Sequence, residues 1–375
     1  MKIGVLVPHI FAQQEILEKV IFAPVHLAVN MADMMSEIHE TYLFTPGRVQ
    51  TRAKNITVNL SLFNEELARE LCTLPELITK NPLSFVSLSR QVQAELASKA
   101  FELCNTGKLD ILHVFMCESE IPLYFSNLVN IPVVFTHHDP YNFYRKYRVT
   151  FPKLKNLNYV SISKSQQKTA AAGMNFVANV YNGIDLSEFK FRSSSDDYFA
   201  YLGRIIRVKG CHTAISACID VGADLRIVGK YYSGAKPKDE DYWTKYIKPK
   251  LDDQNIRYDG FVAGPSAKSR FLGGAKALLF PVEWDEPFGV VMIEAMACGT
   301  PVIAFDRGSV KEIIDDGKTG FVVKDLQGMK QAMKKIDTID REECRKLVKE
   351  KFTVKSMTAG YLRVYKKLLQ SRSCT

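Results

Sequence analysis

The sequence has 375 residues, 46% hydrophobic and 24% charged, a composition that excludes a disordered chain and favours two folded domains, since one core rarely organises this length. The formal net charge is +9, and most of the excess follows residue 190, where 32 Lys and Arg stand against 24 Asp and Glu; anionic ligands, lipids and nucleic acid all fit such an excess. No run of about 18 apolar residues predicts a transmembrane helix, and eight scattered cysteines without zinc-site spacing favour reduced, cytoplasmic thiols.

Short runs rich in Val, Ile and Leu alternate with segments of helical periodicity, which predicts the α/β class with parallel sheets. In the first half we expect a helix over 91–103 and strands at 2–7, 41–45, 111–115, 133–136, 159–162 and 177–180. The pattern restarts in the second half, with strands expected at 199–202, 224–228, 256–258, 277–280, 302–305 and 320–323.

The polar, serine-rich stretch 190–197 separates these two series of strands. We therefore predict an N-terminal Rossmann-like domain over 1–190, a second over 191–352, and a C-terminal amphipathic helix over 353–375 that packs back toward the N-terminal domain. Two such sheets are expected to face each other across a cleft that the loops after their strands line.

Two features of the first half carry candidate chemistry. The expected strand 133–136 runs into His137-His138-Asp139, for which a metal site is a minor alternative because adjacent side chains diverge. From 140 to 184 there are seven basic residues and no acidic one, and the tyrosines and Phe143 interleave with Arg145, Lys146 and Arg148. This tract suits an anionic acceptor, a lipid headgroup or nucleic acid, and a solvated basic surface explains it equally well.

The second half holds two loop motifs between a strand and a helix. In Gly203-Arg204-Ile-Ile-Arg-Val-Lys209-Gly210, glycines permit close backbone approach and two cations complement a diphosphate. In Trp284 to Pro301, an acidic loop leads into a helix expected to begin near Pro287, and the N–H groups of Phe288, Gly289 and Val290 suit an anionic or polyhydroxyl ligand.

Glu286 and Glu294 lie eight residues apart in this second motif, just before the expected helix and about two turns along it. Carboxylates accept hydrogen bonds from vicinal hydroxyls, so two of them suit two sugars. The alternative is a helix-start acid and a solvated surface residue, although Glu294 lies in an otherwise apolar stretch and needs a partner.

These motifs resemble the family-4 retaining glycosyltransferases, which have the GT-B fold of two facing Rossmann-like domains. The Glu286-Pro-Phe-Gly to Glu294-Ala-Met-Ala-Cys-Gly-Thr-Pro segment is similar to the family's E-x7-E motif, and 203–210 to its diphosphate clamp. The segments 180–185, 308–314 and 317–322 are similar as well. The first loop, residues 8–14, departs from the family because it lacks glycine, which puts phosphate cradling there in doubt.

The resemblance implies a role for each matching residue. Glu286 would bind donor-sugar hydroxyls, Glu294 the ribose, and Arg204 and Lys209 the leaving diphosphate. The backbone of Gly203 and the N–H groups of 288–290 would complete the donor site, while Gly229 and Val262 would belong to the base-recognition loops. His138, chosen over His137, would be the active-site histidine, with Asp139 beside it in the substrate site.

We thus expect a cytoplasmic hexosyltransferase that uses a nucleoside-diphosphate sugar, with UDP-sugar favoured over GDP-sugar, and neither metal nor cofactor. The acceptor is open among glycan, lipid and small metabolite, with an anionic one suggested; no nucleic-acid partner is expected, and weak peripheral contact with the inner membrane face is a minor hypothesis. The alternatives are an epimerase or phosphorylase on the same fold, or a nucleic-acid- or membrane-binding protein with an inactive sugar-nucleotide site.

Overall fold

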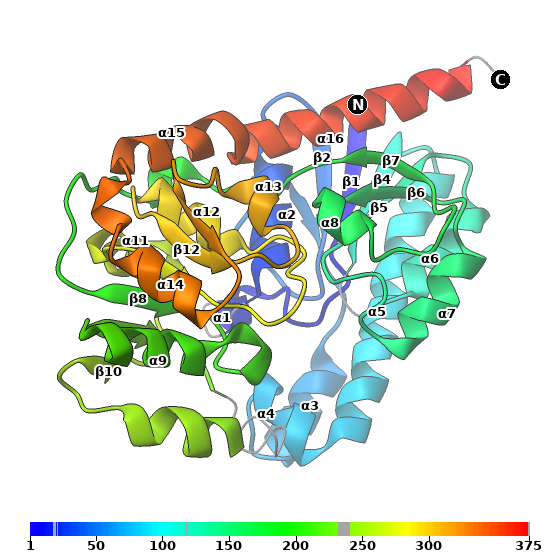
Figure 1. The fold of residues 1–375 in the computed structure, drawn as a ribbon. Helices are drawn as coiled ribbons and strands as arrows, with labels where there is room; N and C mark the ends of the chain where they lie inside the picture. The colour runs from blue at the N-terminus through cyan, green and yellow to red at the C-terminus, as the bar shows by residue number, and fades with distance from the viewer. Residues whose placement is uncertain (18–19, 21, 117–118, 232–240, 374–375) are drawn as a thin grey trace. The chain divides into compact units, whose positions relative to one another are not determined.

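The computed structural model describes residues 1–17, 20, 22–116, 119–231 and 241–373. The chain divides into two compact units: unit 1 contains Met1–Asn182 and Val354–Thr375, and unit 2 contains Gly183–Thr353 (Figure 1). Both have a Rossmann-like parallel sheet with helices, as the sequence predicts. Within the described ranges, no helix is both long enough and apolar enough to cross a bilayer.

In the described part of unit 1, seven parallel strands pair in the order β3-β2-β1-β4-β5-β6-β7. Their bounds are β1 Lys2–Leu6, β2 Glu40–Phe44, β3 Lys54–Ile56, β4 Ile111–Met116, β5 Val133–His137, β6 Asn158–Ser161 and β7 Phe176–Asn179. The sequence predicts six of these strands but not β3, which is an edge strand of three residues without an apolar run. The order reverses at β1 and β4, so the loops after these two strands leave the same edge side by side.

Helices cover the sheet of unit 1 and contribute to its core together with the strands. Their bounds are α1 Gln14–Leu17, α2 Ala23–Ser36, α3 Ser61–Arg69, α4 Leu74–Lys80, α5 Pro82–Asn105, α6 Ile121–Phe125, α7 Arg145–Lys153, α8 Lys164–Gln167, α16 Val354–Ser373 and the short 3-10 turn η1 Ser126–Leu128. The long helix α5 packs against β1 and β4 and buries Leu96 and Phe101 in the core.

The C-terminal helix α16 packs against α2 in unit 1, which confirms the prediction that it returns to the N-terminal domain. A buried polar network fastens it: His113 of β4 meets the Tyr365 hydroxyl through Nδ1 at 2.6 Å and Thr136 Oγ1 of β5 through Nε2 at 2.8 Å. Thr136 Oγ1 in turn donates to the Tyr361 hydroxyl at 3.2 Å. Burial holds the pKa of His113 well below its usual value, so the ring is neutral.

In the described part of unit 2, six parallel strands pair in the order β10-β9-β8-β11-β12-β13. Their bounds are β8 Phe199–Leu202, β9 Leu225–Val228, β10 Ile256–Tyr258, β11 Leu278–Phe280, β12 Val302–Phe305 and β13 Gly320–Val323. All six agree with the predicted strands to within one residue. The order reverses between β8 and β11, which makes the carboxyl ends of these strands the expected ligand edge.

Among the helices of unit 2, α15 binds the segment that connects unit 1 to unit 2. Their bounds are α9 Cys211–Val221, α11 Gly264–Gly274, α12 Val290–Ala297, α13 Val310–Ile313, α14 Leu326–Met333, α15 Arg341–Lys351, the 3-10 turns η2 Leu186–Glu188, η3 Arg207–Lys209, η5 Lys248–Lys250 and η6 Ile336–Thr338, and the π-helical turn η4 Trp243–Ile247. Arg345 of α15 donates to the carbonyls of Phe189 at 2.6 Å and Leu186 at 3.1 Å. The division therefore falls after Asn182 rather than at 190, because these bonds tie the connecting segment to unit 2.

Candidate active site

The two loop motifs of unit 2 come together at the point where its strand order reverses. The loop 203–210 follows β8 and the loop 281–289 follows β11, and the two strands are neighbours in the sheet. The Glu283 N–H donates to the Val208 carbonyl at 2.9 Å. Gly210 has φ +72°, and a Cβ there would lie 1.9 Å from the Pro281 carbonyl oxygen. Glycine thus lets the loops touch through their backbones.

This contact places a cation against the first of the two predicted carboxylates. Lys209 Nζ forms an ion pair with Glu286 Oε2, and the Trp284 indole Nε1 donates to the same oxygen at 2.8 Å. Lys209 Nζ also lies 4.9 Å from the centre of the Trp284 ring, a cation–π distance. Glu286 is 8% exposed. The sequence predicts Lys209 and Glu286 at one site, whereas nothing in it singles out Trp284.

The backbone of Glu286 is fixed by the loop after β12. The Ser309 N–H donates to the Glu286 carbonyl at 3.0 Å, and the Ser309 hydroxyl donates to the Phe288 carbonyl at 2.9 Å. Gly308 has φ +60°, and a Cβ there would lie 2.3 Å from the Glu286 carbonyl oxygen. The sequence places Gly308 and Ser309 in a family-like segment without predicting a role for them. In the structure they position Glu286.

Helix α12 begins at Val290 rather than near Pro287, because Gly289 adopts the left-handed conformation with φ +78° and interrupts the chain before it. The first N–H groups of any helix have no partner within it, so this start remains suited to an anion. Glu294 lies in the second turn of α12, is 7% exposed and pairs with Lys268 of α11 at 2.9 Å. It is therefore not a solvated surface residue, and the helix start is nearer to it than predicted.

The remaining predicted residues of unit 2 lie on the loops after β8, β9 and β10. The Gly229 N–H donates to the Gly260 carbonyl at 2.9 Å, and a Cβ on Gly229 would lie 1.9 Å from the Gly203 carbonyl oxygen. The structure thus brings Gly203 and Gly229 together. Arg204 is exposed beside them, and Val262 is half-buried on the loop after β10.

The tandem histidines of unit 1 have different surroundings. His137 at the end of β5 is fully buried, with ring centroids 5.1 Å from Tyr141, 4.7 Å from Tyr147 and 5.3 Å from Phe151. His138 is half-buried and stacks on Phe115 at 5.3 Å. Burial lowers the pKa of both imidazoles to about 3, so both are neutral at ordinary pH. Asp139 follows, half-buried, and its carbonyl accepts from Gln166 Nε2 at 2.9 Å.

The glycine-free first loop is ordered by aromatic contacts instead of by tight turns. The His9 ring lies 4.2 Å from Phe22 and 4.9 Å from Phe11, and the Phe11 N–H donates to His9 Nδ1 at 3.2 Å. Gln13 Nε2 closes the turn on the Ile10 carbonyl at 2.7 Å. Bulky side chains therefore occupy the loop in which the family that this sequence resembles has glycines.

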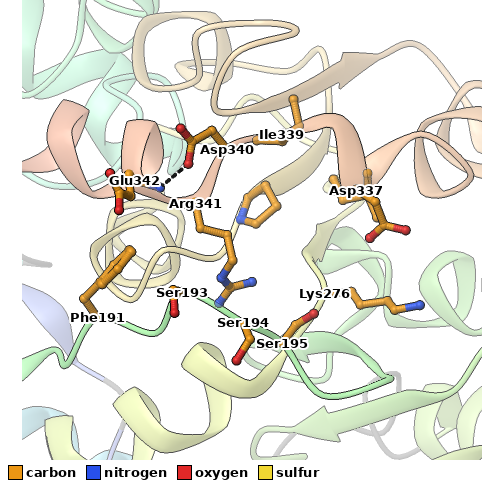
Figure 2. A pocket seen from close by; sticks show the side chains of 12 residues that line it. Phe191, Ser193, Ser194, Ser195, Lys276, Asp337, Ile339, Asp340, Arg341 and Glu342 are labelled. Atoms are coloured by element: carbon orange, nitrogen blue, oxygen red, sulfur yellow. Dashed lines mark hydrogen bonds between the residues drawn. The ribbon is translucent and has the colours of Figure 1, made fainter.

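Unit 2 also has a hollow of about 510 Å³ where β11 and β12 begin, at the sheet edge opposite the loop motifs. Figure 2 shows the side chains that line it, among them Arg341 and Lys276. Its Arg341 donates to the carbonyls of Arg192, Ala275 and Gly273 at 2.8–2.9 Å, and its Lys276 pairs with Asp197 at 2.5 Å. Because protein groups already bind both cations, we assign no ligand there. In the described ranges, no group of three or more His, Cys, Asp and Glu has metal-site geometry.

Comparisons with known proteins indicate a family for unit 2 and a fold for the chain. Residues 184–352 match the model of the family Glycosyl transferases group 1. Unit 2 matches this family along nearly its whole length, and we call it the group 1 unit. Its span contains both loop motifs, the Lys209–Glu286 pair and Glu294, so the predicted family resemblance is confirmed.

Individual curated proteins resemble this chain at low identity, over half to three quarters of its length. Spore coat protein SA of Bacillus subtilis is 25% identical over 51% of this chain and 56% of its own length. D-inositol 3-phosphate glycosyltransferase of an Arthrobacter species is 28% identical over 58% and 59%. The chain thus spans less than two thirds of either relative. Putative glycosyltransferase YtcC of Bacillus subtilis is 23% identical over 74% and 75%.

Solved structures establish the fold of the whole chain. Sucrose-phosphate synthase from Thermosynechococcus elongatus superposes with a TM-score of 0.72 at 17% identity, covering 99% of this chain and 100% of that one. Anabaena HepE, solved in complex with UDP-glucose, gives 0.63 at 16% identity, with both chains fully covered. The group 1 unit and unit 1 together therefore form a GT-B fold.

Proposed function

We propose that the protein is a retaining glycosyltransferase that transfers a hexosyl unit from a nucleoside-diphosphate sugar to an acceptor hydroxyl. The observation that supports this most is the Lys209–Glu286 pair at the strand-order reversal of a group 1 unit. A buried carboxylate held by a lysine suits a polyhydroxyl ligand with an adjacent phosphate. UDP-sugar is favoured and GDP-sugar is the alternative, in keeping with the UDP complexes solved for Anabaena HepE.

In this proposal each predicted residue of unit 2 has one task. Glu286 accepts hydrogen bonds from the donor-sugar hydroxyls, and Glu294 accepts those of the ribose. Arg204 and Lys209 neutralise the diphosphate, which the N–H groups at residues 288–290 also bind. Gly203, Gly229 and Val262 form the backbone and wall of the nucleotide site. Glu294 lies inside α12 and Arg204 is exposed, which suits a contained ribose and a diphosphate near solvent.

The reaction breaks the bond between the anomeric carbon and the diphosphate oxygen and forms a bond from that carbon to the acceptor oxygen. We propose attack on the face from which the diphosphate leaves, which retains configuration, and transfer of the acceptor proton to a diphosphate oxygen. Negative charge develops on the diphosphate, and preorganised cations and helix N–H groups stabilise it. Arg204, Lys209 and the start of α12 supply these groups, so we propose that no metal or cofactor is required.

For unit 1 we propose that His138 contacts the transferred sugar, with Asp139 beside it. His138 Nε2 is buried and has no hydrogen-bond partner among the described residues. A buried, unpaired nitrogen costs free energy unless a ligand satisfies it. Because its lowered pKa keeps the ring neutral, it can hydrogen-bond a hydroxyl without adding positive charge beside the leaving group.

We propose that the acceptor is anionic and that α7 recognises it. The buried side of α7 carries Tyr147 and Phe151, while Arg145, Arg148 and Val149 are exposed. Exposed cations beside an apolar side chain suit a lipid headgroup at a membrane surface as well as an anionic glycan. As a minor part of the proposal, the protein binds weakly and salt-sensitively at the inner membrane face.

Nucleotide release from a panel of UDP-, GDP- and ADP-sugars tests the proposed function. Glu286→Ala and Arg204→Ala should each lower turnover by about tenfold or more, because each removes charge-assisted hydrogen bonds. Glu283→Ala is the matched control, since this exposed glutamate lies on the same loop. Turnover that both site variants retain in full would contradict the assignment, and sugar conversion that never needs an acceptor would indicate an epimerase.

A further inference from the structure

Trp284 belongs to the candidate site, yet neither the sequence motifs nor the proposed roles assign it a task. Its indole Nε1 donates to Glu286 Oε2 at 2.8 Å, and its ring lies 4.9 Å from Lys209 Nζ. Lys209 Nζ binds that same Oε2. Trp284 therefore contacts both members of the ion pair at once, one through a hydrogen bond and the other through its π-face.

These contacts make the two oxygens of Glu286 unequal. Oε2 accepts from both Lys209 and Trp284, whereas Oε1 accepts no hydrogen bond from any described residue. A carboxylate oxygen with two charge-assisted or N–H donors has little capacity left for a ligand. Oε1 is thus the oxygen that remains for a substrate hydroxyl.

The backbone around Glu286 leaves side-chain rotation as its main freedom. Ser309 fixes the Glu286 carbonyl, the Gly308 N–H donates to Asp285 Oδ1 at 3.2 Å, and Glu283 is tied to Val208. Lys209 has a long, flexible stem and cannot by itself define a carboxylate plane, whereas an indole N–H is rigid and directional. The Trp284 hydrogen bond is therefore what selects the carboxylate orientation.

We propose that Trp284 is a positioning residue that holds Oε2 and so presents Oε1 of Glu286 to the donor sugar. This inference rests on the proposed function, since it assigns Glu286 to the sugar. It separates two parts of donor binding. Loss of the indole N–H should weaken binding of the sugar. Binding of the nucleoside diphosphate by Lys209 should remain, because a phenylalanine in place of Trp284 preserves the contact between Lys209 and an aromatic ring.

Trp284→Phe tests this with a ratio of affinities. Calorimetry with UDP-glucose and with UDP should show about tenfold weaker binding of UDP-glucose to the variant, as expected for one lost hydrogen bond to a charged group, and UDP binding within about twofold of the parent. The matched control is Trp243→Phe, because Trp243 is the chain's other tryptophan and lies in the same unit. That control should leave the ratio unchanged. Equal weakening of both ligands by Trp284→Phe, or weakening of neither, would overturn the proposal.

A second readout needs no ligand. The chain has two tryptophans, so its ¹H–¹⁵N spectrum holds two indole signals, which Trp243→Phe assigns. Glu286→Ala should shift the Trp284 indole proton and leave that of Trp243 in place. A Trp284 signal that does not move would overturn the inference. If Glu286→Ala produces this shift but the parent protein binds none of the sugar nucleotides, the proposed function alone is contradicted.

Discussion

At the scale of single residues, the glycines of the candidate site are required for different reasons. A Cβ on Gly229 would collide with the Gly203 carbonyl oxygen at 1.9 Å, and neither backbone can yield without breaking the pairing of these loops. A Cβ on Gly203 would meet nothing closer than the Tyr201 hydroxyl at 3.8 Å, an ordinary contact. Packing therefore requires glycine at 229, whereas a requirement at 203 must come from a ligand.

Paired alanine substitutions separate these reasons. Gly229→Ala should lower the free energy of unfolding by roughly 1–3 kcal/mol, the usual cost of overpacking. Gly203→Ala should change it by less than about 0.5 kcal/mol and yet weaken UDP binding. Urea unfolding and calorimetry measure the two effects. A Gly203→Ala variant that binds UDP like the parent would show that the diphosphate does not approach this loop.

At the scale of elements, the sequence predicts the buried strands well, whereas it misses one edge strand and misplaces the start of one helix. The strands β8 and β12 are predicted to the residue because continuous apolar runs mark buried central strands. The edge strands β10 and β13 are predicted to the residue as well, although β10 carries an exposed Arg257. The edge strand β3 is missed, since Lys54-Asn55-Ile56 has no such run. The start of α12 is set by Gly289, which is in the left-handed conformation. The sequence predicts an earlier start, because proline is common in the first turn of a helix and Pro287 precedes Gly289.

The helix α16 depends on a hydrogen bond that its amphipathic pattern does not reveal. Tyr365→Phe keeps the packed ring but leaves His113 Nδ1 buried without its partner. We expect a loss of about 1–3 kcal/mol in the free energy of unfolding, the cost of an unsatisfied buried group. Thermal unfolding measures it, with Tyr124→Phe, an exposed tyrosine of unit 1, as the control. Equal stability of the two variants would contradict the role of this bond.

At the scale of the whole molecule, the sequence places residues on loops, and the strand order decides which loops meet. Lys209 and Glu286 are 77 residues apart, and their contact follows from the adjacency of β8 and β11 in a switched sheet. The Lys268–Glu294 pair and the Trp284 contact depend on side-chain geometry that no local pattern encodes. Motif reasoning therefore brings the candidate residues to one place but does not predict the hydrogen bonds among them.

The histidines are distributed unequally, and this predicts that the two units differ in acid stability. Six of the seven lie in unit 1, where burial lowers the pKa of His137 and His138 to about 3 and holds that of His113 well below its usual value. Below about pH 6.5 the unfolded chain binds protons that the folded unit 1 does not. Its stability is therefore complete above that pH and is lost as the pH falls from about 6.5 toward 3.

For the fully buried His137 the loss should approach about 1.4 kcal/mol per pH unit within that window. Hydrogen exchange read by mass spectrometry at about pH 7 and about pH 5, corrected for intrinsic rates, resolves the two units. Peptides of β4 and β5 should lose protection before those of β11 and β12. His137→Phe fits the surrounding aromatic rings and removes one titrating group, so it should reduce the acid sensitivity of unit 1. Earlier opening of unit 2 would show that its ion-paired carboxylates, not the buried histidines, govern acid unfolding.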